Sequence, residues 1–290
     1  MLNGQKKKEC TLALICAVII VVFTCIGVVM NLVTTNDANF DHRGLKTFCM
    51  FTVNSNILTA IGMSLVIPYA IDGLRKPYYN LPGWLITFLL ACTTSVSLTF
   101  IVCLFILFPA QGFYMIFWGS RFFLHLICPI LAFVSFTFIM SSHRIPRVST
   151  FFAVIPTLIY ACVYFVLVVV IGEENGGWND FYGFTTYVPF YVSAAVIIPA
   201  AYGLANLIRV LHNRTYERKR ELRNTDKYDP GYLIGEIMSL ARLERKNEAP
   251  GSDIVIPRRL IQFLLDSTDN EMDLYDALSL YLKTYIMPAH

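Results

Sequence analysis

Residues 11–34 read TLALICAVIIVVFTCIGVVMNLVT, a stretch without a charged side chain. A helix needs about 20 apolar residues to cross the hydrocarbon core of a membrane, so this stretch is long enough to span one. It follows Lys6, Lys7 and Lys8, as the apolar part of a signal peptide would. It is too long for that part, however, and no small-residue cleavage site follows it. We therefore predict a retained first transmembrane helix.

The rest of the chain contains five further windows of the same kind. They are residues 48–71, 84–109, 115–140, 149–171 and 187–210. Across the 290 residues, 56% are hydrophobic and 15% are charged, whereas about 25% of the residues in soluble domains are charged. The sequence predicts an all-α, polytopic membrane protein with six transmembrane helices, and we expect it in the cell membrane.

Basic residues in the loops predict the orientation, because they collect on the cytoplasmic side. If the N-terminus is cytoplasmic, that side receives Lys6, Lys7, Lys8, Arg75, Lys76, Arg144, Arg147 and the basic segment after Arg209. The opposite loops contain Arg43 and Lys46 beside Asp37 and Asp41, and the acidic GEENGGWNDFYG of residues 172–183. This asymmetry predicts that both termini are cytoplasmic (N-in, C-in).

The composition changes after residue 212, where HNRTYERKRELRNTDKYDP begins a charged segment. Residues 231–247, 256–267 and 270–286 then place apolar side chains at helical spacing, with a loop at 248–253. We predict a six-helix transmembrane domain over 1–212 and a small helical cytoplasmic tail over 213–290. The basic start of the tail is suited to anionic lipid headgroups, although a plain positive-inside signal also explains it, and an unknown protein is a second possible partner.

Cofactor and metal motifs are not evident in the sequence. Seven of the eight cysteines lie within apolar runs, and they have no metal-ligand spacing. A metal site could be built in the outer loops from Asp37, Asp41, His42, Glu173 and Glu174, although scattered loop carboxylates are usually solvated. We found no phosphate-binding glycine loop and no nucleic-acid motif. The sequence therefore predicts no cofactor, no metal and no nucleic-acid partner.

The second window opens with FTVNSNILT at residues 51–59, which carries a polar stripe. Thr52, Ser55, Asn56 and Thr59 fall at i, i+3, i+4 and i+7, so they share one helix face. Hydroxyl and amide side chains can join membrane helices through hydrogen bonds. The stripe is therefore either a helix contact or a reactive site.

Ionisable side chains inside a membrane span are costly and are functional candidates by default. Arg121 and His125, in GSRFFLHLICPI at 119–130, stand out here, with Pro129 one turn further along. The second and fourth windows run in the same direction, and at 1.5 Å per residue His125 lies within roughly 10 Å of Thr52 in depth. A hydroxyl and an imidazole that meet in this way are the minimum for a nucleophile and its base.

Two motifs carry a resemblance to a known family. FTVNSN at 51–56, followed two windows later by LHLICP at 124–129, resembles the androgen-induced-gene-like family of six-span membrane proteins, including its bacterial branch. Eukaryotic members of that family are intramembrane threonine hydrolases that cleave fatty acid esters of hydroxy fatty acids. The resemblance covers about residues 11–210, and it implies Thr52 and His125 as the essential pair. The tail beyond residue 212 departs from the compact members.

On this interpretation the chain is a lipid-ester hydrolase in which Thr52 attacks the ester and His125 accepts and returns its proton. Ser55 and Asn56 are candidates for holding the hydroxyl or donating to the oxyanion. Arg121 either pairs with a fatty-acid carboxylate or extends to the headgroups. The substrate would be a fatty-acyl ester already dissolved in the membrane.

Other functions stay open. No Asp or Glu within the windows is an obvious third member of a catalytic triad, which weakens the enzyme interpretation. A non-enzymatic sensor or receptor for a lipid or small molecule, with the tail as its output, is the alternative. A transporter predicts prolines or glycines at matching positions of two halves, and Pro68, Pro156, Pro189 and Pro199 do not match in this way.

Overall fold

The computed structural model describes residues 2–33, 44–75, 81–185 and 189–227. Throughout this part of the chain the regular structure is helical, and no strand occurs in it. The helices expected at 231–247, 256–267 and 270–286 lie outside the described residues. The all-α prediction is thus confirmed for the membrane region.

Within the described residues, six helices are long and apolar enough to cross a membrane, as predicted. They are α1 (Leu2–Val33), α2 (Phe51–Arg75), α3 (Gly83–Val102), the run of η3 (Phe122–Ile127), α6 (Cys128–Val134) and η4 (Ser135–Ile139), α7 (Val148–Tyr164) with η5 (Phe165–Ile171), and α8 (Phe190–Lys227). The shorter elements are η1 (Gly44–Cys49), η2 (Cys103–Leu107), α4 (Phe108–Gln111), α5 (Phe113–Phe117) and η6 (Glu173–Asn175). Helix α8 continues past residue 212, so the start of the predicted tail extends the sixth span.

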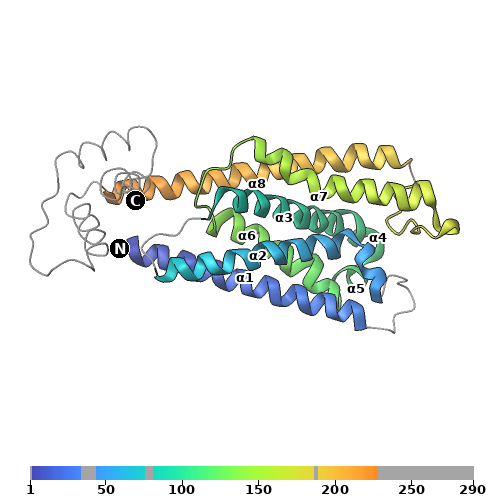
Figure 1. Ribbon diagram of the computed structural model, residues 1–290, viewed down its shortest axis with the longest axis horizontal. Helices are drawn as coiled ribbons and strands as arrows, with labels where there is room; N and C mark the ends of the chain where they lie inside the picture. The colour runs from blue at the N-terminus through green and yellow to red at the C-terminus, as the bar shows by residue number, and fades with distance from the viewer. Residues whose placement is uncertain (1, 34–43, 76–80, 186–188, 228–290) are drawn as a thin grey trace, which may run out of the picture. The chain divides into compact units, whose positions relative to one another are not determined.

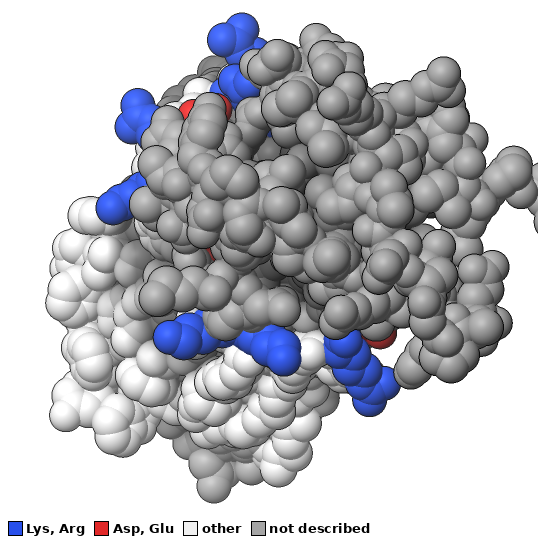
Figure 2. All heavy atoms as spheres, turned by 90° about the vertical axis from the view of Figure 1, so that its left-hand side faces the viewer, with Lys and Arg blue, Asp and Glu red and all other residues white. Residues whose placement is uncertain are grey.

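Successive spans run in opposite directions, which gives the bundle two distinct ends (Figure 1). At the first, here called the basic end, α1 begins and α8 ends. At the second, here called the loop end, α2 begins and residues 172–185 connect α7 with α8. Lys and Arg side chains lie at the basic end (Figure 2). This is the arrangement from which a cytoplasmic basic end was predicted.

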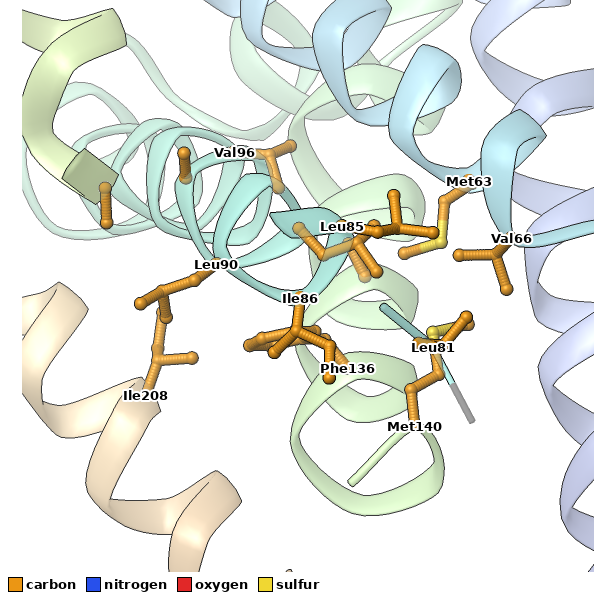
Figure 3. Close-up of a cluster of buried hydrophobic side chains, with 14 of the residues drawn as sticks. Met63, Val66, Leu81, Leu85, Ile86, Leu90, Val96, Phe136, Met140 and Ile208 are labelled. Carbon is orange, nitrogen blue, oxygen red and sulfur yellow. The ribbon is translucent and has the colours of Figure 1, made fainter. Parts of the chain in front are cut away.

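Helix α3 is the most buried of the spans and packs against α2, α6 and α7. Its residues Leu85, Leu89 and Leu90 are fully buried. Met63 from α2, Phe136 from η4 and other apolar side chains surround them (Figure 3). In a water-soluble protein, burying such a side chain contributes about 1.5–3 kcal/mol to the free energy of unfolding. Between membrane helices, the van der Waals packing of the side chains holds the helices together.

The outward faces of the spans are apolar as well. Ile159 of α7 is 60% exposed and Val196 of α8 is 65% exposed, and α1 shows Val29 in the same way. A water-soluble protein rarely exposes large continuous apolar surface. These faces are therefore suited to contact with lipid, and the chain is described below as a multi-pass membrane protein.

The fourth span begins later than predicted. Residues 113–117 form the separate helix α5, Trp118 is extended, and Gly119 has a φ of +64°. A φ in this range favours glycine, so the chain turns here before η3 begins at Phe122. His125 is consequently the fourth residue of η3 and lies near the start of its span, whereas the predicted window of 115–140 placed it ten residues in.

Candidate functional site

Most of the polar stripe on α2 joins helices together. The Ser55 hydroxyl lies 3.2 Å from that of Thr99 on α3. The Thr59 hydroxyl donates to the carbonyl of Ser55 at 2.8 Å and approaches that of Cys92, again on α3, at 3.3 Å. These side chains are buried, and each satisfies its hydroxyl within the bundle. This part of the stripe is a helix contact.

Asn56 joins the two motifs that were singled out in the sequence. Its amide nitrogen donates to the carbonyl of Thr52 at 2.8 Å and to the carbonyl of Leu124 at 2.9 Å. Leu124 immediately precedes His125, so one side chain connects the turn of Thr52 with the turn of His125. Both amide hydrogens are used by main-chain carbonyls. The amide oxygen is buried without a hydrogen-bond partner among the described residues.

Thr52 differs from the rest of the stripe, because it borders a cavity of about 80 Å³. Residues from α2, α3, η2, α7, α8 and the loop at the loop end form its wall, and most of them are apolar. A water molecule needs about 10–15 Å³ by this measure, so the cavity has room for several atoms of an apolar chain. Thr157 of α7 also lines it, with a hydroxyl that is buried and has no partner within the described segments.

His125 lies in η3, one turn before Pro129, and is buried. Its Nδ1 is 2.7 Å from the carbonyl oxygen of Ile116 in α5. A carbonyl can only accept a hydrogen bond, so this contact places the hydrogen of a neutral imidazole on Nδ1. Nε2 is then the nitrogen with a free electron pair, which a general base requires. Irregular π-type turns such as η3 are frequent at functional sites.

The structure brings the Thr52 and His125 motifs together but does not place both side chains on the cavity. We expected a cavity between the second and fourth spans. The cavity that Thr52 borders lies among α2, α3, α7 and α8, and His125 is not part of its wall. Arg121 is half-buried at the start of η3, one turn before His125. Its two suggested roles, with a carboxylate or with headgroups, stay predictions.

Tyr182 was missed by the sequence analysis. Its hydroxyl oxygen accepts a 3.0 Å hydrogen bond from the backbone N–H of Phe51 and is in polar contact with the side chains of Thr52 and Tyr160. Tyr182 also lines the cavity. Burial raises the pKa of Tyr182 to about 12, so the phenol keeps its proton at neutral pH. The hint in the sequence was the aromatic run WNDFYGF at 178–184, in a loop that was judged only by its charge.

Asp180 holds this loop in place through four hydrogen bonds. Its Oδ1 accepts from the Tyr164 hydroxyl at 2.6 Å and from the N–H of Phe184 at 2.9 Å. Its Oδ2 accepts from the N–H and the hydroxyl of Thr185, at 2.7 and 2.5 Å. Hydrogen bonds to a carboxylate are stronger than those between neutral groups. Asp180 therefore fixes the residues on either side of Tyr182 to the end of α7.

An aromatic cluster contributes Tyr164, Tyr182 and Phe184 to the cavity wall. Tyr164, which is 1% exposed, is at its centre, with ring centroids of Phe181, Phe184 and Tyr182 at 5.3, 5.5 and 5.8 Å. Aromatic pairs at these separations contribute about 0.5–1.5 kcal/mol each. The loop is thus packed against the end of α7.

Among the described residues, no group of three or more His, Cys, Asp or Glu side chains is placed to hold a metal ion. Asp37, Asp41 and His42 lie outside those residues. Comparisons with models of known protein families, with characterised proteins and with solved structures found no match.

Proposed function

We propose that this protein is an intramembrane hydrolase of fatty-acyl esters, with Thr52 as nucleophile and His125 as base. The observation that carries the proposal is the position of Thr52. It is the member of the polar stripe whose side chain borders an apolar cavity, and Asn56 ties its turn to the turn of His125. An apolar cavity with a few polar groups is the usual form of a small-molecule site.

The reaction follows the general scheme for a hydroxyl nucleophile. Thr52 Oγ1 forms a bond to the ester carbonyl carbon, its proton passes to His125 Nε2, and the carbonyl electron pair moves onto the carbonyl oxygen. When the intermediate collapses, the bond to the alcohol oxygen breaks and that oxygen takes the proton from His125. A water molecule then attacks the acyl-threonine ester in the same way, which releases the fatty acid and restores Thr52.

His125 does not border the cavity in this structure. Proton transfer therefore requires a bridging water molecule or a rotation of the Thr52 side chain towards the ring. Catalytic hydrogen bonds are often long in the absence of substrate. The tautomer set by Ile116 supports the role, because it leaves Nε2 as the acceptor.

The test is hydrolysis of a long-chain acyl ester of 4-methylumbelliferone by the purified protein in lipid nanodiscs. Thr52→Val removes the hydroxyl and nearly preserves the side-chain shape. Thr59→Val is the matched control, because it removes a buried hydroxyl from the same face of α2 that contacts α3. We expect wild type and Thr59→Val to hydrolyse the ester and Thr52→Val and His125→Ala to lose at least 100-fold in kcat. Equal activity of Thr52→Val and wild type would refute the role of Thr52.

A second candidate is a non-enzymatic sensor of a membrane lipid or apolar small molecule. The observation in its favour is that the cavity wall contains Thr52 but not His125. A sensor would bind a photoreactive fatty-acyl probe in the cavity, with cross-links on α7 and α8, and would show no turnover by wild type. The output of such a sensor, the tail after Lys227, lies outside the described residues.

The proposed orientation places the basic end in the cytoplasm and the loop end outside. The basic side chains of Figure 2 support it. On this orientation the cavity lies near the outer leaflet of the cell membrane, and a lipid substrate enters from that leaflet.

A further inference from the structure

We infer that Tyr182 is a catalytic residue that donates its phenol hydrogen to the ester carbonyl oxygen when Thr52 attacks. The inference rests on the proposed function and adds to it the group that stabilises the oxyanion. Tyr182 comes from the loop between α7 and α8, more than a hundred residues after Thr52 in the sequence. The fold brings the two side chains into polar contact at the same wall of one cavity.

Three donors close to Thr52 are already occupied, whereas the Thr157 hydroxyl on the α7 side of the cavity has no partner among the described residues. Both amide hydrogens of Asn56 go to main-chain carbonyls, at 2.8 and 2.9 Å. The backbone N–H of Phe51 donates to Tyr182 at 3.0 Å. The hydroxyl of Tyr160 donates to the carbonyl of Cys49 at 2.7 Å. None of these three residues has a hydrogen available for a substrate oxygen in this arrangement.

The phenol of Tyr182 keeps its own hydrogen to donate. Its oxygen already accepts from the Phe51 N–H, and a phenol has one hydrogen to donate. In the resting structure the neighbouring oxygen atoms are those of Tyr160 and Thr52. A rotation about the C–O bond directs this hydrogen to the oxygen of a ligand beside Thr52. Burial keeps the pKa of Tyr182 at about 12, so the donor is present throughout the neutral range.

The position of the Tyr182 hydroxyl is fixed before substrate binds. Asp180 anchors the loop through Tyr164, Phe184 and Thr185, and the Phe51 N–H holds the phenol oxygen itself. A donor held in advance at the place where negative charge develops needs no reorganisation during the reaction, and losing one such donor costs about 10²–10³ in kcat.

The experiment compares Tyr182→Phe with wild type in the umbelliferyl ester assay, with Tyr160→Phe as the matched control. Tyr160→Phe also removes a phenol hydroxyl from the cavity wall, but the hydrogen of that hydroxyl is donated to the carbonyl of Cys49. We expect kcat to fall by about 10²–10³ in Tyr182→Phe with little change in KM, and to fall only a few-fold in Tyr160→Phe. If wild type hydrolyses the ester and Tyr182→Phe keeps kcat within three-fold, the inference is wrong and the proposed function stands. If wild type does not hydrolyse the ester, both the inference and the proposed function are wrong.

A second measurement tests the inference if the Tyr182→Phe variant does not fold. Replacing Tyr182 with 3,5-difluorotyrosine keeps the hydroxyl and lowers the pKa of the phenol. If Tyr182 donates a hydrogen bond during the reaction, the alkaline limb of the kcat profile moves to lower pH by the same amount as that pKa. A structural role would leave the position of this limb unchanged, and such a result would overturn the inference.

Discussion

Asn56 donates a 2.9 Å hydrogen bond to the carbonyl of Leu124, and this bond joins the helix of Thr52 to the helix of His125. The same amide also binds the carbonyl of Thr52 at 2.8 Å. Asn56 was expected to hold the nucleophile or to donate to the oxyanion. In this geometry its donors go to the two backbones, so it holds the relative position of the two motifs. Any effect of Asn56 on the proposed hydrolysis is therefore indirect.

The first prediction follows from this bridge. Asn56→Leu has a similar volume and cannot donate, so we expect a loss of about 1–3 kcal/mol in the free energy of unfolding, because the carbonyl of Leu124 is left without its partner. Hydrolysis should fall with it. Asn54→Leu is the control, since its amide donates to Phe48 at an exposed position and should change stability by less than about 0.5 kcal/mol. Thermal unfolding in nanodiscs measures both. Equal melting temperatures for the two variants would contradict the bridge.

The second prediction concerns the titration of Tyr182. Its pKa is raised from about 10 in an unfolded chain to about 12 in the fold by burial. A raised pKa means that the neutral phenol is favoured by folding, so its contribution to stability is complete below pH 10. It is lost as the pH rises from about 10 to about 12. The tyrosinate absorbance of wild type minus Tyr182→Phe should therefore rise close to pH 12, and a midpoint near 10 would show that Tyr182 is solvated.

The membrane spans could be predicted because length and apolarity are properties of continuous segments. The start of the fourth span was misplaced for the same reason. Residues 113–118 are as apolar as a span, and the break is a backbone turn at Gly119 that hydropathy does not detect. Because η3 begins only at Phe122, His125 lies near the start of its span, as Thr52 does.

Tyr182 could not be predicted in the same way. Its place beside Thr52 depends on how the loop folds back onto the end of α7, through the contacts of Asp180 and of Gly177. Such contacts join residues of a loop whose path has no periodic pattern. The stripe on α2 has a periodic pattern, and its spacing shows that four side chains share a helix face. The spacing does not show that Thr52 borders a cavity while Ser55 and Thr59 contact α3.

The third prediction tests the path of this loop. Gly177 donates to the carbonyl of Gly172 at 2.9 Å, and a Cβ at Gly177 would lie 2.1 Å from the carbonyl oxygen of Leu167. Since both neighbours are backbone, Gly177→Ala must displace the loop, and we expect kcat to fall towards the level of Tyr182→Phe. Gly83→Ala is the control, because a Cβ there meets nothing within 4 Å.

Limited proteolysis of the loop and ester hydrolysis measure the effect of these two glycine variants. The expected pattern is faster cleavage between residues 172 and 185 in Gly177→Ala and an unchanged pattern in Gly83→Ala. Full activity in Gly177→Ala would mean that the loop does not have to hold Tyr182 in this position.

The fourth prediction concerns orientation. Two variants, Glu173→Cys and Arg144→Cys, each add one cysteine to the native ones. The two positions lie at opposite ends of the bundle, at the start of η6 and between η4 and α7. In intact cells a membrane-impermeant maleimide should label the cysteine at 173 and leave the cysteine at 144 unlabelled until the cells are opened. The unsubstituted protein gives the background from native cysteines such as Cys25 and Cys162. The reverse pattern would place the basic end, and with it the tail, outside the cell.

The last prediction asks whether Thr52 and His125 act as one unit. The effects on kcat of substituting two residues that act in the same step are strongly non-additive, because the second residue cannot act once the first is removed. We therefore expect Thr52→Val with His125→Ala to have nearly the kcat of either single variant. Pairing Thr52→Val with Thr59→Val instead should give an additive result, since Thr59 contacts α3 and not the cavity. The measurement is a double-mutant cycle on the umbelliferyl ester. If the losses of Thr52→Val and His125→Ala multiply, the two side chains act independently, and His125 is a structural histidine held by Ile116 rather than the base.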